Sequence, residues 1–331
     1  MHVYLHKILN KIMLNRRILR IKAFKVLYSS VLAENMSLAQ AEAQLDASCE
    51  AARDLYIYML GIVSPLTQIA RERIDAAKNK FNPTEEEKNP NMKFVENQLA
   101  KLIDEDVDFQ KIFAKKKFGW GQYDIFLKEV MNSIQTKEYF AEYMASPERS
   151  LAEDCRLFTK IYEEEFVDNQ TLERILEDKS LYWNDDLAYS LTWCCKTLKS
   201  FAKGEGWKLL PLYQSEMLKG DGVESDKLFV RKLLQASFAG YEKYSAMVAE
   251  SVSGWEKERL FSTDVVLIVM GLAETVTFPT IPVKVTMNEY VEISKFYGTP
   301  KSRSFVNGLL DRLVQTLVNE GQVVKSGKGL V

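Results

Sequence analysis

Three arginines and two aromatic residues near the start of this chain have the types and spacing of a surface that binds a polyanion. On a helix that turns by about 100° per residue, Arg16, Arg17 and Arg20 fall within one sector. Phe24 and Tyr28 follow on the same side, one and two turns later. Guanidinium groups bind phosphate in a bidentate manner and stack on bases, and exposed rings offer further stacking platforms. The pattern therefore favours contact with a phosphate-rich chain, and an ordinary solvated helix face is the alternative.

The charge of the chain is unevenly distributed. Residues 1–33 carry seven lysines and arginines, Lys25 among them, and no acidic residue. Because the whole chain of 331 residues has a formal net charge of -2, the part after residue 33 carries -9. A basic arm on an acidic body is typical of an end that binds anions.

A second basic cluster lies near the C-terminus. In "SRSFVNGLLDRL" (302–313), apolar residues recur at helical spacing, so most of this stretch is expected to form a buried stripe. The basic run 301–303 directly precedes the stripe, and Asn307 and Gly308, both poor helix formers, interrupt it. This placement indicates a role for the amide and the glycine beyond helix formation.

The sequence contains no recognisable catalytic motif. Glycine-rich phosphate loops, G-x-S-x-G and H-E-x-x-H are all missing. The two histidines, His2 and His6, lie in the N-terminal tail, which argues against histidine-based metal or triad chemistry. Acidic clusters such as 163–165 are typical of solvated helix faces, with a paired-carboxylate hydrolase as a remote alternative. We therefore expect no catalytic residue, no metal site and no cofactor, and thus a protein that is not an enzyme.

The cysteines and the hydropathy indicate a cytoplasmic protein without a membrane segment. None of the four cysteines forms a C-x-x-C pair, and the adjacent Cys194 and Cys195 have poor geometry for a disulfide or a metal, which fits a reduced cytoplasm. No apolar run reaches the roughly 18 residues of a membrane span, and the N-terminus lacks a signal-peptide pattern.

Helix patterns dominate the chain, and alternating strand patterns are nearly missing, so the expected fold class is all-α. The sequence "TMNE" predicts a capping box between Thr286 and Glu289, and Gly298 is expected to end the helix that follows. The N-terminal helix should bury a stripe made of Leu19, Ala23 and Val26.

Two breaks divide the helical pattern. The stretch "FNPTEEEKNPN" (81–91) has the composition of a linker, and glycine-containing stretches at 203–207 and 219–226 mark a second boundary. Residues 81–225 therefore form a separate helical segment, and its many aromatic residues are expected to be its own core.

Both ends of the chain resemble the NusB family of transcription antitermination factors. "RRILRIKAFKVLYSSVLAE" (16–34) resembles the family's opening helix, an arginine cluster followed by A-x-x-x-L-Y. "VTMNEYVEISKFYGTPKSRSFVNGLLDRL" (285–313) resembles its closing part, N-E-x-V-E-x-x-K-x-[FY]-G followed by a polar loop and F-V-N-G-x-L-D. Residues 229–274 are similar to the two middle helices, with Trp255 and Arg259 at their connection.

The chain departs from the family pattern at two places. Leu267-Ile268 stands where the family commonly has Leu-Arg, so one arginine is lost. Lys301 stands where the polar loop often has an acid, a change that favours RNA binding.

The resemblance implies a NusB-type helical bundle with a large inserted helical segment. In chain order, the expected parts are an N-terminal extension (1–15), a bundle in two pieces (16–80 and 226–322), a helical insert of unassigned role between them (81–225) and a flexible tail (323–331). Met13 lies where family members usually start, which favours a misassigned start for the residues before it.

The resemblance also implies a binding site, because in the family the opening helix and the start of the last helix lie side by side and hold single-stranded RNA. The RNA-binding residues that it implies are Arg16, Arg17, Arg20, Lys25, Tyr28, Lys301, Ser302, Arg303 and Asn307. The structural residues that it implies are Asn288, Glu289, Gly298, Phe305 and Gly308. In this arrangement the charged residues contact phosphates, Asn307 reads a base edge, Gly308 allows close backbone packing and Phe305 anchors its helix in the core.

The function implied by the resemblance is that of an RNA-binding transcription antitermination factor. Such a protein binds boxA-type RNA of ribosomal RNA leaders together with the small-subunit ribosomal protein that acts as NusE. The complex then acts on RNA polymerase to suppress premature termination. One alternative is an accessory domain related to RNA cytosine methyltransferases, which is disfavoured because the sequence contains no glycine-rich cofactor motif and no Pro-Cys nucleophile motif. The other is a NusB-like helical scaffold that binds proteins without reading RNA.

Overall fold

The computed structural model describes residues 13–33, 36–213, 225–252 and 263–330, and within these ranges it contains helices and no strand. The expected all-α fold class is therefore confirmed. The chain folds into two compact units. We call residues 50–210 the insert unit, and the described residues of 13–49 and 211–330 the bundle unit. The long helix α2 (Leu38–Leu60) contributes residues to both units.

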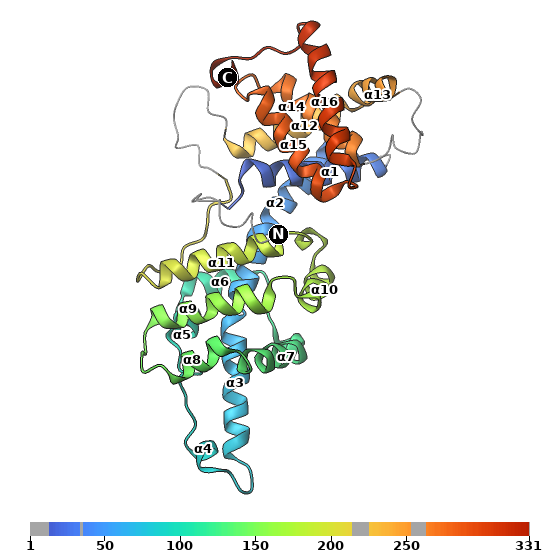
Figure 1. Ribbon diagram of the computed structural model, residues 1–331. Helices are drawn as coiled ribbons and strands as arrows, with labels where there is room; N and C mark the ends of the chain where they lie inside the picture. Colours follow the sequence, from blue (N-terminus) through green and yellow to red (C-terminus); the bar gives the residue numbers. More distant parts are fainter. Residues whose placement is uncertain (1–12, 34–35, 214–224, 253–262, 331) are drawn as a thin grey trace. The chain divides into compact units, whose positions relative to one another are not determined.

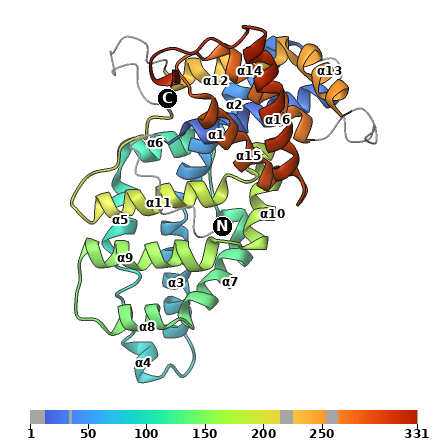
Figure 2. The ribbon, with the colours of Figure 1, turned by 45° about the horizontal axis from the view of Figure 1, so that its top comes forward.

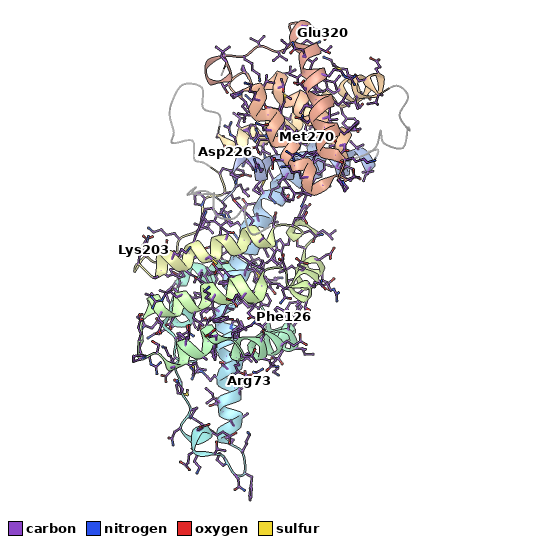
Figure 3. All side chains as sticks on the ribbon, viewed as in Figure 1. Arg73, Phe126, Lys203, Asp226, Met270 and Glu320 are labelled. Atoms are coloured by element: carbon purple, nitrogen blue, oxygen red, sulfur yellow. The ribbon has the colours of Figure 1, made fainter. Side chains whose placement is uncertain are left out.

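The bundle unit combines helices from both ends of the sequence (Figure 1). Beside the first part of α2, they are α1 (Arg16–Leu32), α12 (Asp226–Ala239), α13 (Tyr241–Ser251), α14 (Thr263–Thr277), α15 (Val283–Tyr297) and α16 (Ser302–Asn319). Helix α14 is the centre, because it packs against α1, α12, α13, α15 and α16. Residues 265–275 of α14 are all buried, as expected for a helix that is apolar on every side. Figure 3 labels Met270 at the middle of this helix.

One glycine lets the neighbours of α14 approach closely. A Cβ atom on Gly271 would lie 2.9 Å from the side chain of Leu310 in α16 and 3.3 Å from the ring of Tyr290 in α15. Glycine at this position therefore lets both helices pack directly on the backbone of α14.

Helix α1 begins at Arg16 with a side-chain cap. Asn15 is the N-cap, and its side chain accepts a hydrogen bond from the backbone N–H of Ile18. The predicted buried stripe is confirmed, since Leu19, Ala23 and Val26 are all buried.

Residues 13–15 belong to the bundle unit and not to an extension. Met13 and Leu14 are fully buried, and their backbone N–H groups donate to the carbonyls of Pro211 (3.0 Å) and Leu212 (2.9 Å). The expected extension over 1–15 therefore does not include residues 13–15, because Met13 and Leu14 are buried and bonded to residues 211 and 212. His2 and His6 lie outside the described residues.

Helix α15 begins earlier than the predicted capping box. Its N-cap is Pro282, and Thr286 is buried inside the helix, where its hydroxyl donates to Oε1 of Glu274 at 2.8 Å. The prediction was wrong because Thr286 bonds a buried carboxylate from α14 instead of the start of its own helix. Proline near a helix start is well tolerated, because the first N–H groups have no partner within the helix. The predicted end of the helix is confirmed, with Gly298 as its C-cap.

Residues 323–330 pack against the bundle unit, although the sequence indicated a flexible tail. The ammonium group of Lys325 donates to the carbonyls of Thr275 (2.9 Å) and Phe278 (3.0 Å). The backbone N–H of Ser326 donates to the carbonyl of Pro279 at 3.0 Å. The carbonyls at the end of α14 need donors, and this segment supplies them.

The helices of the insert unit after α2 are α3 (Val63–Lys78), α4 (Glu85–Lys88), α5 (Gln98–Glu105), α6 (Val107–Lys115), α7 (Asp124–Gln135), α8 (Glu138–Ala145), α9 (Leu151–Ile161), α10 (Gln170–Lys179) and α11 (Leu187–Phe201), with short helical turns at Gly121–Tyr123, Tyr162–Phe166 and Leu181–Trp183. In the insert unit, helix α3 runs behind α9 toward α4 in the view of Figure 2. Helix α3 packs against α4, α5 and α7. Residues 50–80 therefore fold with the insert, and the boundary lies near residue 50 instead of the expected 81.

The aromatic residues of the insert unit form its own core, as predicted. Tyr58 of α2 stacks on Trp120 at a centroid distance of 4.3 Å and on Trp183 at 5.3 Å. Both indole rings are buried, and so are the indole ring of Trp193 and the phenyl ring of Phe126. In the described ranges, no helix is both long and apolar enough to span a lipid bilayer.

Candidate nucleic-acid interface

Helices α1 and α15 lie side by side in the bundle unit and run in the same direction. The guanidinium group of Arg17 donates two hydrogen bonds to the carboxylate of Glu289, at 2.8 and 2.6 Å. Seven residues later on α1, the ring of Phe24 contacts that of Tyr297 at a centroid distance of 5.3 Å. The ion pair and the ring contact fix the register of the two helices and bring the second half of α1 to the end of α15.

Arg20 is a core residue, which corrects the expectation that it lies on the surface. Only 3% of its surface is exposed, and it donates two hydrogen bonds of 2.7 Å to Glu274, which is fully buried. Burial by itself lowers the pKa of Arg20, but the charge and hydrogen bonds of Glu274 raise this pKa above its ordinary value. Tyr290 also donates to Glu274, at 3.0 Å, and burial raises the pKa of this tyrosine. Arg20 therefore neutralises a buried acid and is not available to phosphate.

The other two arginines of the predicted cluster are half-buried and also paired with acids. Nε of Arg16 donates to Asp226 at 3.1 Å, and its guanidinium group lies 4.7 Å from the ring centre of Phe229 in α12. Arg17 is held by Glu289. The structure thus does not bring the arginines together as an unpaired basic face, because acids more than 200 residues away in the sequence neutralise them.

Lys25 and Tyr28 lie on the second half of α1, beside the end of α15. The ammonium group of Lys25 lies 5.7 Å from the ring centre of Tyr297, within the range of a cation–π interaction. The half-buried ring of Tyr28 stacks on Phe24 at 6.0 Å. Extending the register of α1 and α15 by one more turn places Tyr28 at the level of the loop that follows Gly298. Lys25 and Tyr28 therefore lie at the same end of α15 as the second basic cluster.

The loop between α15 and α16 is held in place by a buried serine. Ser302 accepts a hydrogen bond from the backbone N–H of Thr299 (2.8 Å) and donates to Asp264 at the start of α14 (2.7 Å). A Cβ atom on Gly298 would overlap the side chain of Ser302, so this glycine is required for space, while its φ of -107° is open to any residue. Ser302 was expected to contact phosphate, and this is corrected: the hydroxyl is buried and occupied.

Lys301 and Arg303 flank this buried serine and are both exposed. Neither has an ion pair among the residues that the structure describes. They lie at the N-cap and in the first turn of α16, where cations are disfavoured by the helix dipole and where unpaired backbone N–H groups attract anions. Two exposed cations at a helix start have the charge and position that suit an anionic ligand.

Asn307 lies one turn further along α16, and its amide is exposed to solvent. The exposed Asn288 on α15 makes no side-chain hydrogen bond within the described ranges. Two other expectations for this region are corrected. Phe305 is only half-buried, whereas the next residue, Val306, is fully buried in the core. Gly308 faces open space, so it serves no close packing.

Sequence reasoning missed Glu274, the residue that organises the bundle. A signal was present, because Glu274 is a single acid after the apolar run 265–273, and a buried carboxylate needs a cation and hydrogen-bond donors. The sequence could not identify the cation, since Arg20 is 254 residues away.

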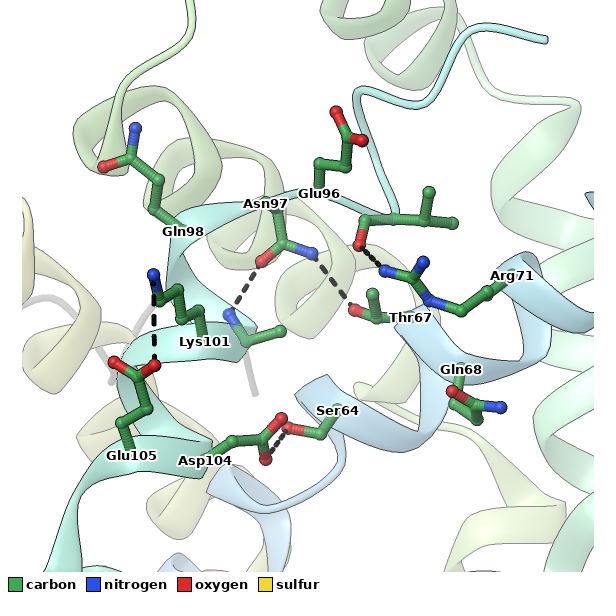
Figure 4. Close-up of a pocket in the computed structure, with 12 residues that line it drawn as sticks. Ser64, Thr67, Gln68, Arg71, Glu96, Asn97, Gln98, Lys101, Asp104 and Glu105 are labelled. Carbon is green, nitrogen blue, oxygen red and sulfur yellow. Dashed lines mark hydrogen bonds and ion pairs between the residues drawn. The ribbon is translucent and has the colours of Figure 1, made fainter.

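The insert unit has a polar pocket of about 640 Å³ between α3 and α5, shown in Figure 4. Its groups bond to one another: Ser64 donates to Asp104 (2.6 Å) and Asn97 donates to Thr67 (3.1 Å). This pocket is best explained as a hydrogen-bonded junction of two helices. Within the described part of the chain, no group of three cysteines, histidines or acids is placed to hold a metal ion.

The bundle unit defines the class of this protein as an all-α bundle that presents a basic turn between its last two long helices. Comparison with known proteins identifies the family. Residues 203–315 match the model of the NusB family, so this part of the chain is a NusB-family domain. Trp255 and Arg259, expected at a helix connection of this part, lie outside the described residues.

Relatives that match include several named transcription antitermination protein NusB. The protein of Salinibacter ruber is 29% identical over 134 residues, which cover 36% of this chain and 84% of the relative. That of Chloroherpeton thalassium is 34% identical over 105 residues, and the match spans half of its length. That of Syntrophotalea carbinolica is 36% identical over 106 residues, 66% of its length. No solved structure matches the chain.

Proposed function

We propose that this protein is an RNA-binding transcription antitermination factor and that it acts by binding, without a catalytic step. In this proposal it binds boxA-type single-stranded RNA of ribosomal RNA leaders together with the small-subunit ribosomal protein that acts as NusE. The complex acts on RNA polymerase to suppress premature termination. The observation that carries the proposal is the exposed pair Lys301 and Arg303 at the start of α16, inside the part that matches the NusB family.

The division of labour follows from burial and pairing. Lys301, Arg303 and the first N–H groups of α16 contact phosphates, and Lys25 lies close enough to extend the same path. Asn307 offers an exposed amide with both donors and an acceptor for the edge of an unstacked base. Arg16 and Arg17 serve mainly to hold α12 and α15 beside α1, because their charges are offset by acids on those two helices.

The test is the salt dependence of RNA binding. Each phosphate contact of a single strand contributes about -0.7 to the log–log slope, so the double variant Lys301→Gln/Arg303→Gln should lose about 1.4 units. A matched control is Lys227→Gln/Lys284→Gln, which removes two exposed lysines from the first turns of α12 and α15. Lys284 lies about 20 Å along α15 from Tyr297. The control should keep the wild-type slope, and both variants should keep the fold, since all four side chains are exposed.

The role of the Asn307 amide is tested by comparing the affinities for boxA-type and scrambled RNA. Asn307→Ala should weaken the binding of boxA-type RNA more than that of scrambled RNA. It should leave the salt dependence of binding unchanged, because it removes a contact to a base and not a charge. A protein that shows no preference for boxA-type over scrambled RNA, with and without the ribosomal protein, would instead be a NusB-like scaffold for protein partners.

A further inference from the structure

Phe296, in the last turn of α15, presents an aromatic ring to solvent. Its exposed fraction is 59%, and among the described residues of the bundle unit it is the only aromatic side chain in the exposed class. A single exposed apolar side chain is ordinary on a protein surface, so a partner is indicated here only by the position of this ring and by the residues near it.

The position of Phe296 on its helix places it toward α1. Phe296 follows Glu289 by seven residues, and residues seven apart lie on nearly the same face of a helix. Glu289 faces α1, because it binds Arg17. The ring of Phe296 therefore lies on the side of α15 that borders α1, two turns beyond this ion pair.

The backbone under this ring is firmly held. The next residue, Tyr297, packs on Phe24 and is covered by the ammonium group of Lys25. Gly298 then ends the helix, and the buried Ser302 packs against it. A ring that is presented on a fixed helix end loses little conformational freedom when a flat partner stacks on it.

Three basic residues lie near Phe296, on the neighbouring helix or in the following stretch of chain. Lys25 of α1 lies over the ring of Tyr297, the residue after Phe296, and Lys301 and Arg303 follow in the loop and at the start of α16. The nearest acid on the same helix, Glu292, is paired with Lys295. An exposed ring within a group of cations is the arrangement by which proteins hold single-stranded nucleic acid, with phosphates on the cations and a base on the ring.

We infer that Phe296 stacks on an unpaired base of the RNA whose phosphates Lys301 and Arg303 hold. This inference rests on the proposed function and adds a base-stacking residue to it. Stacking tolerates any base, so Phe296 fixes the position of the strand, while Asn307 reads the identity of a base.

The experiment measures binding of a short boxA-type RNA to the full-length protein and to variants at position 296. Phe296→Ala should weaken binding about tenfold and leave the salt slope unchanged, because no charge is lost. Phe296→Tyr should bind as the wild type does, and Phe296→Leu should bind as the alanine variant does, because leucine keeps apolar area but has no π face. Val318→Ala, an exposed apolar residue near the other end of α16, is the control and should have no effect.

The stacked base is located with abasic nucleotides placed at each RNA position in turn. At one position the abasic RNA should bind the wild type and Phe296→Ala almost equally, since the interaction is then already lost. Equal loss from Phe296→Ala at every abasic position, or full affinity in this variant, would overturn the stacking role while leaving the proposed function intact. Unchanged RNA affinity with weaker binding of the ribosomal protein would assign this ring to a protein partner and also overturn the inference. A wild type that binds no RNA would overturn the proposed function and the inference together.

Discussion

At the scale of single residues, the bundle depends on one buried carboxylate. Glu274 accepts hydrogen bonds from Arg20, Thr286 and Tyr290, which belong to α1 and α15. A buried charge of this kind is tolerated only while its partners remain, because an unpaired carboxylate in the core has lost its hydration without compensation.

Arg20→Gln should therefore destabilise the bundle unit by about 3–5 kcal/mol, the cost of leaving a buried ion without its partner. Arg17→Gln is the matched control, because it breaks a half-exposed ion pair and should cost about 1 kcal/mol or less. Urea unfolding followed by circular dichroism measures both values. Equal and small costs for the two variants would show that Glu274 is not held as a buried charge. An RNA-binding test that replaced all three arginines would confound lost folding with lost binding.

Two cysteines of the insert unit should be unreactive in the native protein. Burial, aided by the nearby charges of Asp154 and Glu163 respectively, raises the pKa of Cys155 and of Cys195 to about 12. Because the thiolate is the reactive form, only about one thiol in 10⁴ would be ionised at pH 8. We expect alkylation of both to be far slower than that of a free thiol at this pH, and to become fast in urea. Peptide mass spectrometry after timed alkylation measures each rate, and rapid native labelling would contradict the burial of these residues.

At the scale of elements, the turn between α15 and α16 decides where the basic residues lie. Gly298 and Ser302 approach each other so closely that the helix end and the next helix start are fixed together, and Ser302 ties them to α14. Lys301 and Arg303 are thereby held at defined positions on either side of a buried residue.

Two glycine-to-alanine changes should have opposite effects on stability. Gly298→Ala places a methyl group against Ser302 and 2.7 Å from the carbonyl oxygen of Ser294, and should destabilise by about 1–3 kcal/mol. Gly308→Ala adds its methyl group in open space within α16 and should stabilise by up to about 1 kcal/mol, since alanine has the higher helix propensity. Thermal unfolding of both variants gives the comparison. A destabilised Gly308→Ala would mean that this glycine packs closely after all.

At the scale of the whole molecule, the chain contains two units with separate cores. Buried aromatic rings fill the insert unit, whereas α14 and the buried pair of Arg20 and Glu274 form the centre of the bundle unit. The family match falls on 203–315, mainly in the bundle unit, and leaves most of the insert unit outside it.

We expect the two units to unfold in separate transitions, because each buries its own core. Four of the five tryptophans belong to the insert unit, so tryptophan fluorescence reports mainly on that unit. Arg20→Gln should shift part of the urea transition seen by circular dichroism and leave the midpoint seen by fluorescence unchanged. A fluorescence midpoint that moves by the same amount would show that the shared helix α2 joins the units into one cooperative structure.

The sequence by itself determined what depends on neighbours along the chain. Helical periodicity predicted the all-α class and the buried stripe at Leu19, Ala23 and Val26, and Gly298 marked a helix end. These features follow from a repeat of 3.6 residues and from local capping, which a short window of sequence contains.

Only the tertiary structure decided which charged and polar residues are free to bind. Arg20 has the same residue type and helix face as its neighbours, yet Glu274 of α14 draws it into the core, and Asp264 does the same to Ser302. The insert unit begins at residue 50 instead of 81, because Tyr58 of α2 stacks on rings of the insert and α3 packs on α5 and α7. Burial and pairing depend on partners tens to hundreds of residues away, and the free energy of these contacts exceeds the local preferences that a sequence pattern can express.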